Sequence, residues 1–199
     1  MSQQYRPPRR RGPSAAAVAL ALLLAALAGV AVGAAIADRQ PGGSPAATAP
    51  TTTPVEAPAV PLEAASVTSF DPVGGSGFRD EGDGTWSTQT YTTAEFGNLK
   101  EGVGLLVDLG APREVTSVTL PSATPGLSVQ LLAGDAPPSG GVDGLVPVGE
   151  PTTTADGPTT LTADAGAHRY WLVWVSQLAA SGDGFAAEMA TPVVEGRPG

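Results

Sequence analysis

The chain has 199 residues, including 26 glycines, 20 prolines, one histidine and no cysteine. The lack of cysteine excludes a disulfide framework, a thiolate nucleophile and a zinc site built from cysteine and histidine. The formal net charge of −9 argues against nucleic acid as a partner. A chain of this length is expected to hold one ordinary domain with attached segments.

The N-terminal part of the sequence predicts a single membrane span. Residues 1–14 carry four arginines and no acidic residue, and residues 15–37 consist only of Ala, Val, Leu, Ile and Gly. As a helix rising about 1.5 Å per residue, this run would be roughly 35 Å long, enough to cross a hydrocarbon core of about 30 Å. The positive charge before the span predicts that residues 1–14 form a cytoplasmic tail and that everything after residue 37 lies outside the cell membrane.

A cleaved signal peptide is the alternative interpretation of the same segment. Ala35, Ile36 and Ala37 resemble a small-residue cleavage site. The apolar run is longer than the roughly 7 to 15 residues usual for a signal peptide, which favours an uncleaved signal anchor. Both interpretations export the rest of the chain.

Residues 38–65 predict a disordered linker. The segment contains six prolines and the run Thr51, Thr52 and Thr53, and it has no aromatic residue. Such a composition cannot bury enough apolar surface to offset the entropy of the chain, so we expect a stalk that is partly in the polyproline II conformation.

Residues 66–199 are the part of the sequence that can build a hydrophobic core, and their pattern predicts an all-β fold. Short apolar or alternating runs are separated by Gly, Pro, Asp and Ser. The expected strands cover residues 66–70, 104–109, 114–120, 127–132, 146–149, 159–163, 168–177 and 185–194. The run from Tyr170 to Val175 is apolar on both faces, as in a central strand covered on each side. About eight strands in two sheets predict a jelly-roll β-sandwich.

Three segments of this domain together resemble a known family. They are GTWSTQTY at residues 84–91, FGNLKEGVGLLVDLG at 96–110 and RYWLVWVSQL at 169–178. The first resembles a segment of discoidin-like, galactose-binding-like jelly rolls. The other two resemble the extracytoplasmic C-terminal domain of actinobacterial MviN/MurJ-type and pseudokinase membrane proteins, and the resemblance covers the exported domain.

The resemblance implies a discoidin-like fold that binds ligands through loops at one end of the sandwich. Members of the group carry the domain behind a cytoplasmic pseudokinase or a multi-span flippase of a cell-wall precursor. Residues 1–14 resemble neither, so neither activity is carried over to this chain. The loop before Thr85 is also shorter than in the family, and Gln177 and Ala179 depart from the family's last strand.

Four residues are candidates for contacting a ligand: Trp86, Thr88, Tyr91 and Arg169. Trp86 follows an acidic loop and could stack on a sugar ring; the alternative is that it caps the core. Arg169 could instead form a structural ion pair with Asp108. Asp80 and Asp83, with Glu81 between them, could supply oxygen atoms to a calcium ion. They do not fill an EF-hand pattern, and a solvated acidic turn is the alternative.

The sequence offers little for catalysis. His168 is the only imidazole, no G-x-S-x-G segment precedes it, and no phosphate-binding glycine motif occurs. We therefore expect a binding module, not an enzyme, displayed outside the cell membrane on a single span. Its expected partner is a cell-envelope glycan or an envelope protein. A structural or scaffolding role, in which the domain docks on another membrane protein of cell-wall synthesis, is the alternative.

Overall fold

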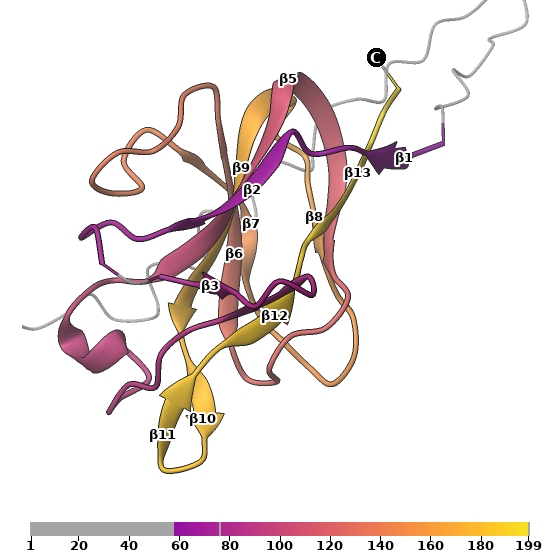
Figure 1. Cartoon of the computed structure of the whole chain (residues 1–199). Helices are drawn as coiled ribbons and strands as arrows, with labels where there is room; N and C mark the ends of the chain where they lie inside the picture. Colours follow the sequence, from indigo (N-terminus) through magenta and orange to yellow (C-terminus); the bar gives the residue numbers. More distant parts are fainter. Residues whose placement is uncertain (1–57, 76, 199) are drawn as a thin grey trace, which may run out of the picture. The chain divides into compact units, whose positions relative to one another are not determined.

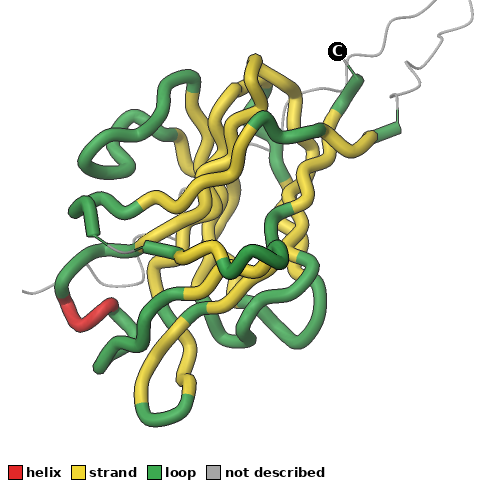
Figure 2. The backbone as a smooth tube through the Cα atoms, in the orientation of Figure 1, coloured by secondary structure: helices red, strands yellow, loops and turns green. Residues whose placement is uncertain are grey.

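The computed structural model describes residues 58–75 and 77–198, and their regular structure is almost entirely β-strand (Figures 1 and 2). The strands are β1 (Val60–Leu62), β2 (Ser66–Phe70), β3 (Arg79–Asp80), β4 (Thr85–Ser87), β5 (Val103–Leu120), β6 (Ser128–Gly134), β7 (Val146–Thr153), β8 (Thr159–Thr162), β9 (Ala167–Gln177), β10 (Ala179–Ser181), β11 (Gly184–Ala186), β12 (Glu188–Ala190) and β13 (Val193–Gly196). One 3₁₀ turn, η1 (Phe96–Asn98), interrupts them, and the described residues contain no α-helix. The predicted all-β class is confirmed.

The long strand β5 joins two antiparallel groups of strands. Its first half pairs with β2 and β9, and β9 continues through β6 to β7. Its second half pairs with β8 and β13, and β13 pairs with β1. Buried residues of both groups, such as Leu105 and Val173 on one side and Val118 and Leu161 on the other, share one core. This arrangement fits a jelly-roll sandwich.

The corner in β5 differs from the predicted turn between two separate strands. Residues 104–109 and 114–120 belong to one strand, which bends where its pairing with β9 shifts register between Asp108 and Arg113 (Figure 1). Gly110 has a φ of +76°, which a residue with a side chain rarely adopts, and its N–H donates to Asp108 Oδ1 at 2.7 Å. The glycine therefore turns the strand from one sheet to the other without ending it.

Strand β9 is the central strand that its composition predicts. It lies between β5 and β6, and its residues 171–175 are buried. Trp171 and Val173 face the main core, whereas Leu172 and Trp174 form a second apolar cluster on the opposite face with Leu132 and other residues. Both faces are covered, as the continuous apolar run requires.

Other predicted boundaries need correction. β1 (Val60–Leu62) lies within residues 38–65, which the composition assigned to a disordered linker. It pairs antiparallel with β13, and Pro61 is compatible with this position because β1 is an edge strand. The expected strand 185–194 is divided among β11, β12 and the start of β13, and the short strands β3, β4 and β10 were not predicted.

The turn η1 packs against the segment that directly follows β4. Phe96, Gly97 and Asn98 all have positive φ angles, of 55°, 65° and 58°. The Phe96 side chain is fully buried, and its ring makes an edge-to-face contact with Tyr91 at 5.3 Å between centroids. Burial of this ring offsets a backbone conformation that is unfavourable for a phenylalanine.

No helix within residues 58–75 and 77–198 is long and apolar enough to span a membrane. The predicted tail at 1–14, the predicted span at 15–37 and residues 38–57 of the predicted linker lie outside the described residues.

Candidate functional site

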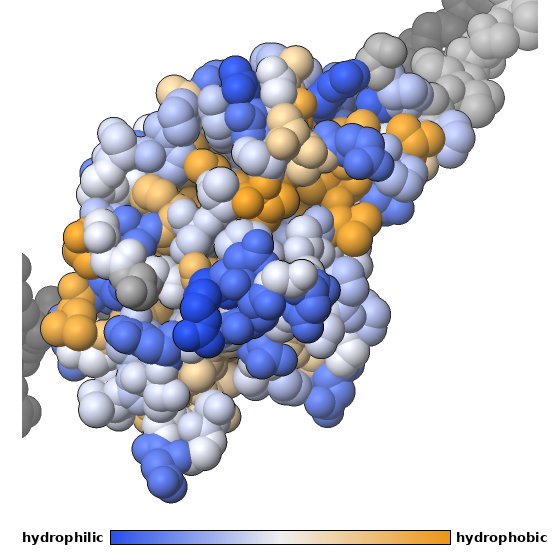
Figure 3. Space-filling view, in the orientation of Figure 1, coloured by the Kyte–Doolittle hydropathy of each residue, from blue (hydrophilic) through white to orange (hydrophobic). Residues whose placement is uncertain are grey.

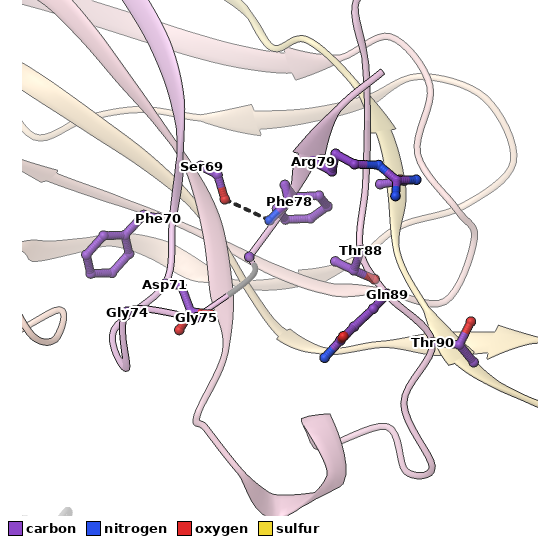
Figure 4. Close-up of a pocket in the computed structure, with 12 residues that line it drawn as sticks. Ser69, Phe70, Asp71, Gly74, Gly75, Phe78, Arg79, Thr88, Gln89 and Thr90 are labelled. Atoms are coloured by element: carbon purple, nitrogen blue, oxygen red, sulfur yellow. Dashed lines mark hydrogen bonds between the residues drawn. The ribbon is translucent and has the colours of Figure 1, made fainter. Parts of the chain in front are cut away.

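A cavity of about 770 Å³ opens between the loop after β2 and the segment after β4 (Figure 4). One wall is the end of β2 with the glycines of the following loop, and the other is residues 87–90 with Arg79 at the edge. We call this cavity the first groove and residues 87–90 the ridge. In the space-filling view, hydrophilic side chains gather over β3 and β12 beside it (Figure 3).

The first wall depends on a close approach between β2 and the start of β3. Ser69 Oγ accepts a 2.7 Å hydrogen bond from the N–H of Phe78 (Figure 4). A Cβ atom at Gly77 would lie 2.5 Å from Ser69 Oγ, so only glycine allows this contact. Gly77 is thereby held close to β2, and with Gly74 and Gly75 it lines the groove.

A buried ion pair also holds the loop after β2 in place. Lys100 Nζ contacts Asp71 Oδ2, and these side chains are only 5% and 4% exposed. Desolvation lowers the pKa of Lys100, but its interactions with Asp71 and Tyr91 raise it more, so the net shift is upward. Asp71 also accepts the N–H of Val73 at 3.0 Å. The pair therefore ties the groove loop to the segment after η1.

The ridge is held by strands β11 and β12. The N–H of Thr88 donates to Ala187 O and Thr88 Oγ1 accepts the N–H of Ala187, both at 2.9 Å. Tyr91 and Phe185 exchange two backbone hydrogen bonds at 2.8 and 2.9 Å. These bonds hold the backbone on both sides of Gln89 and so position the second wall.

Gln89 and Arg79 present polar groups to the first groove. The Gln89 side chain is exposed, has no hydrogen-bond partner among the described residues, and points from the ridge into the space between the two walls (Figure 4). Arg79 donates from Nε and Nη2 to Glu81 Oε1 at 3.0 and 2.8 Å. Hydrogen bonds from Ser87 and then Arg79 lower the pKa of Glu81. The Glu81 carboxylate therefore orients the Arg79 guanidinium and balances its charge.

The groove has the chemistry of a binding site. Hydroxyl, amide and guanidinium groups line it, and no histidine or pair of carboxylates is among its lining residues. His168 lies elsewhere, on β9, with Nδ1 3.2 Å from Asp135 Oδ1 and its ring edge against Trp171. The groove can accept and donate several hydrogen bonds, and its one carboxylate, Asp71, is paired with Lys100.

The structure places two of the predicted ligand residues in the core. Trp86 is 8% exposed, and its Nε1 donates to Thr191 Oγ1 at 3.0 Å. Tyr91 is 5% exposed and packs on Phe96. Neither ring has a free face on which a sugar could stack, so the alternative interpretation, in which Trp86 caps the core, agrees with the structure.

Of the other two predicted ligand residues, one lines the first groove and the other does not. Thr88 lies on the ridge and lines the first groove. Arg169 does not line it; its Nε and Nη2 donate to the two carboxylate oxygens of Asp108 at 2.7 and 2.8 Å. Its guanidinium also lies over the Tyr170 ring at 4.9 Å. The structural ion pair considered from the sequence is therefore present, and together with the hydrogen bond from Gly110 it lowers the pKa of Asp108 to about 2.

The structure gives no support to a calcium site at Asp80 and Asp83. Asp80 Oδ1 accepts the N–H of Gly82 at 2.8 Å, and Asp83 Oδ1 accepts the N–H of Thr85 at 2.9 Å. The bond from Thr85 is the main cause of a lowered pKa at Asp83. Within the described part of the chain, no three acidic or histidine side chains gather as metal ligands. Both carboxylates instead close tight turns.

Sequence reasoning missed most of the residues that line the first groove. Gln89 and Thr90 stand within the family-like segment at 84–91, between the two aromatic residues that were predicted to contact a ligand. The glycines at 74, 75 and 77, which begin four residues after the end of a predicted strand, were the available signal, because they indicate a loop whose backbone approaches another group closely.

No known family profile matches the sequence, and no curated protein matches it. Similar folds occur among solved carbohydrate-binding modules. The CBM32 of AlyQ in complex with 4,5-unsaturated mannuronic acid is 14% identical, with 68% of this chain and 97% of that chain covered and a TM-score of 0.44. Chitosan-binding module 1 from a chitosanase/glucanase of Paenibacillus sp. IK-5 is 18% identical, with 65% and 92% covered and a TM-score of 0.44.

A pectin-binding carbohydrate-binding module is 11% identical, with 67% of this chain and 91% of that chain covered, also at a TM-score of 0.44. At these values the likenesses assign no ligand to this chain. The resemblance to the MviN/MurJ-type and pseudokinase group stays a prediction from the sequence.

Proposed function

We propose that the C-terminal domain is a non-catalytic module that binds a cell-envelope glycan in the first groove. The observation that carries the proposal is the pairing of a hydrogen-bonded polar ridge with a glycine loop across a cavity of about 770 Å³. The Gln89 amide, which has no hydrogen-bond partner among residues 58–75 and 77–198, and the hydroxyls of Thr88 and Thr90 stand on that ridge.

Hydroxyl and amide groups of this kind match the hydrogen-bonding pattern of a saccharide. A pocket for a compact apolar ligand is lined mainly by hydrophobic side chains. The first groove has two phenylalanines, Phe70 and Phe78, among mostly small or polar residues. A ligand with many hydroxyl groups can exchange the bound water of such a groove for direct and water-mediated hydrogen bonds.

The proposal includes the cellular position of the domain. Residues 15–37 would serve as an uncleaved anchor with residues 1–14 in the cytoplasm, and residues 38–57 would space the domain from the membrane. The net charge of the exported part supports an extracytoplasmic glycan over anionic lipid or nucleic acid, because residues 66–199 contain sixteen acidic and five basic side chains.

One observation favours docking on an envelope protein as a second candidate function. Val73 and Leu99 are 64% and 71% exposed. The ion pair between Asp71 and Lys100 brings their two loops together. Exposed apolar side chains on neighbouring loops are typical of protein contacts more than of sugar contacts.

Retention experiments distinguish the two candidates. The full-length chain in detergent is passed over immobilised cell-wall polysaccharides and, separately, over immobilised envelope proteins. We expect retention by at least one polysaccharide and elution by the free oligosaccharide derived from it. Retention only by envelope proteins, lost when Val73 and Leu99 are both replaced by Ser, would reject glycan binding in favour of docking.

A further inference from the structure

A second groove lies on the other side of the ridge. Its volume is about 320 Å³, and its lining includes Ser181, Thr124 and Glu188 together with the ridge residues Ser87, Thr88 and Thr90. These three ridge residues also line the first groove. The two grooves are therefore adjacent and separated only by the ridge.

The second groove is also built on fixed backbone. Thr124 Oγ1 accepts the N–H of Glu188 at 2.9 Å, and the N–H of Thr124 donates to Glu188 O at 2.8 Å. A Cβ atom at Gly184 would lie 2.6 Å from Thr90 Cγ2 and from Tyr91 O, so β11 approaches the ridge as closely as a glycine permits. Neither wall needs to move to form the second groove.

The charges in the two grooves disfavour a polyanion. Arg79 at the first groove is neutralised by Glu81. The Glu188 side chain at the second groove is exposed and has no ion pair within the described residues. An anionic chain crossing both grooves would gain little from Arg79 and would be repelled by Glu188. An uncharged chain can hydrogen-bond to both.

We propose that the two grooves form one extended site, which takes an uncharged polysaccharide chain laid across the ridge and not a terminal sugar alone. This inference rests on the proposed function. Gln89 and the glycine loop hold one part of the chain, the ridge hydroxyls contact the middle, and Ser181 with Glu188 hold the next part. Affinity should then depend on the length of the chain.

Titration calorimetry with the full-length chain tests the inference. The probes are oligosaccharides of increasing length, from disaccharide upward, prepared from each neutral polysaccharide that retains the protein: cellulose, chitin, mannan or arabinogalactan. The variants are Gln89→Ala in the first groove and the double variant Ser181→Ala/Glu188→Ala in the second. Glu63→Ala is the matched control, because Glu63 is exposed and lines neither groove.

We expect the dissociation constant to fall with chain length until both grooves are filled. The double variant should weaken binding of the long oligosaccharides by about tenfold and leave the shortest bound oligosaccharide unaffected. Gln89→Ala should weaken binding at every length. Affinity that is independent of length, or a double variant that binds long chains normally, would overturn the extended site but leave glycan binding intact. Retention by no polysaccharide at all would overturn the proposed function itself.

Discussion

The indole N–H of Trp86 donates a 3.0 Å hydrogen bond to the hydroxyl of Thr191, which is 105 residues away in the sequence. The same hydroxyl donates to Gly84 O at 3.0 Å. Together these bonds fasten the start of β4 to the segment after β12, and the Trp86 ring is buried beneath them. The Trp86 ring is therefore part of the core. In the proposed function, the residues that contact the ligand are those of the ridge that follows it.

Replacing this ring should cost stability. We expect Trp86→Ala to lower the free energy of unfolding by about 3–5 kcal/mol, as for other large-to-small changes at buried aromatics. Trp86→Phe, which keeps most of the volume and loses the hydrogen bond, should cost about 1 kcal/mol. Urea unfolding followed by fluorescence of Trp171 and Trp174 measures both. An alanine variant as stable as the wild type would show that the ring is not part of the core.

The buried pair beneath the groove loop gives a second prediction. Lys100→Met would leave the Asp71 carboxylate buried without its charge partner, and we expect a loss of about 3–5 kcal/mol in the free energy of unfolding. The double variant Asp71→Asn/Lys100→Met removes both charges and should lose clearly less. Equal losses in the single and double variants would show that the two charges are not coupled.

The ion pair between Asp108 and Arg169 predicts a dependence of stability on pH. Arg169, together with the N–H of Gly110, lowers the pKa of Asp108 in the folded protein to about 2 from its ordinary value of 3.8. The contribution of the pair is therefore fully present above about pH 4 and is lost as the pH falls towards 2. In Arg169→Met this dependence should shrink to the part that the hydrogen bond from the Gly110 N–H supplies. Urea unfolding at several pH values between about 5 and 2 tests it, and parallel curves for both proteins would contradict it.

The sequence predicted the features that neighbouring residues determine, and it missed those that residues far apart in the chain determine. The strand at 66–70 and the central strand at 168–177 were predicted well, because a strand of regular pattern carries its own signal. The corner at Gly110 was predicted as a turn, because the sequence does not show that the strand continues in a second sheet. β1 was missed because distant residues hold it: it pairs with β13, and Leu62 packs on the main core.

The candidate site shows the same limit. Trp86 and Tyr91 were selected because aromatic side chains are chemically conspicuous, yet burial removes both from solvent. Gln89 is an ordinary exposed residue by itself. It becomes significant only because hydrogen bonds from β11 and β12 set the ridge opposite the loop after β2, a juxtaposition that local sequence does not encode.

The chain has no cysteine, so a cysteine introduced by substitution is its only thiol. Labelling of that thiol can therefore test the membrane topology. We expect Ser44→Cys to react with a membrane-impermeant maleimide on intact cells whose wall has been permeabilised. Ser2→Cys, on the other side of the proposed span, should react only after lysis. Labelling of Ser44→Cys only after lysis would contradict the proposed orientation, and a mature N-terminus at Asp38 would show that the segment is a cleaved signal peptide.

The most direct test of glycan binding in the first groove is the dissociation constant of Gln89→Ala for the polysaccharide that retains the wild-type chain. Loss of the amide should weaken binding by about tenfold without changing the urea midpoint, because the side chain is exposed and supports no other described residue. Gln177→Ala, an exposed glutamine on β9 outside both grooves, should bind like the wild type. Wild-type affinity in Gln89→Ala would contradict the account and place the ligand elsewhere on the domain.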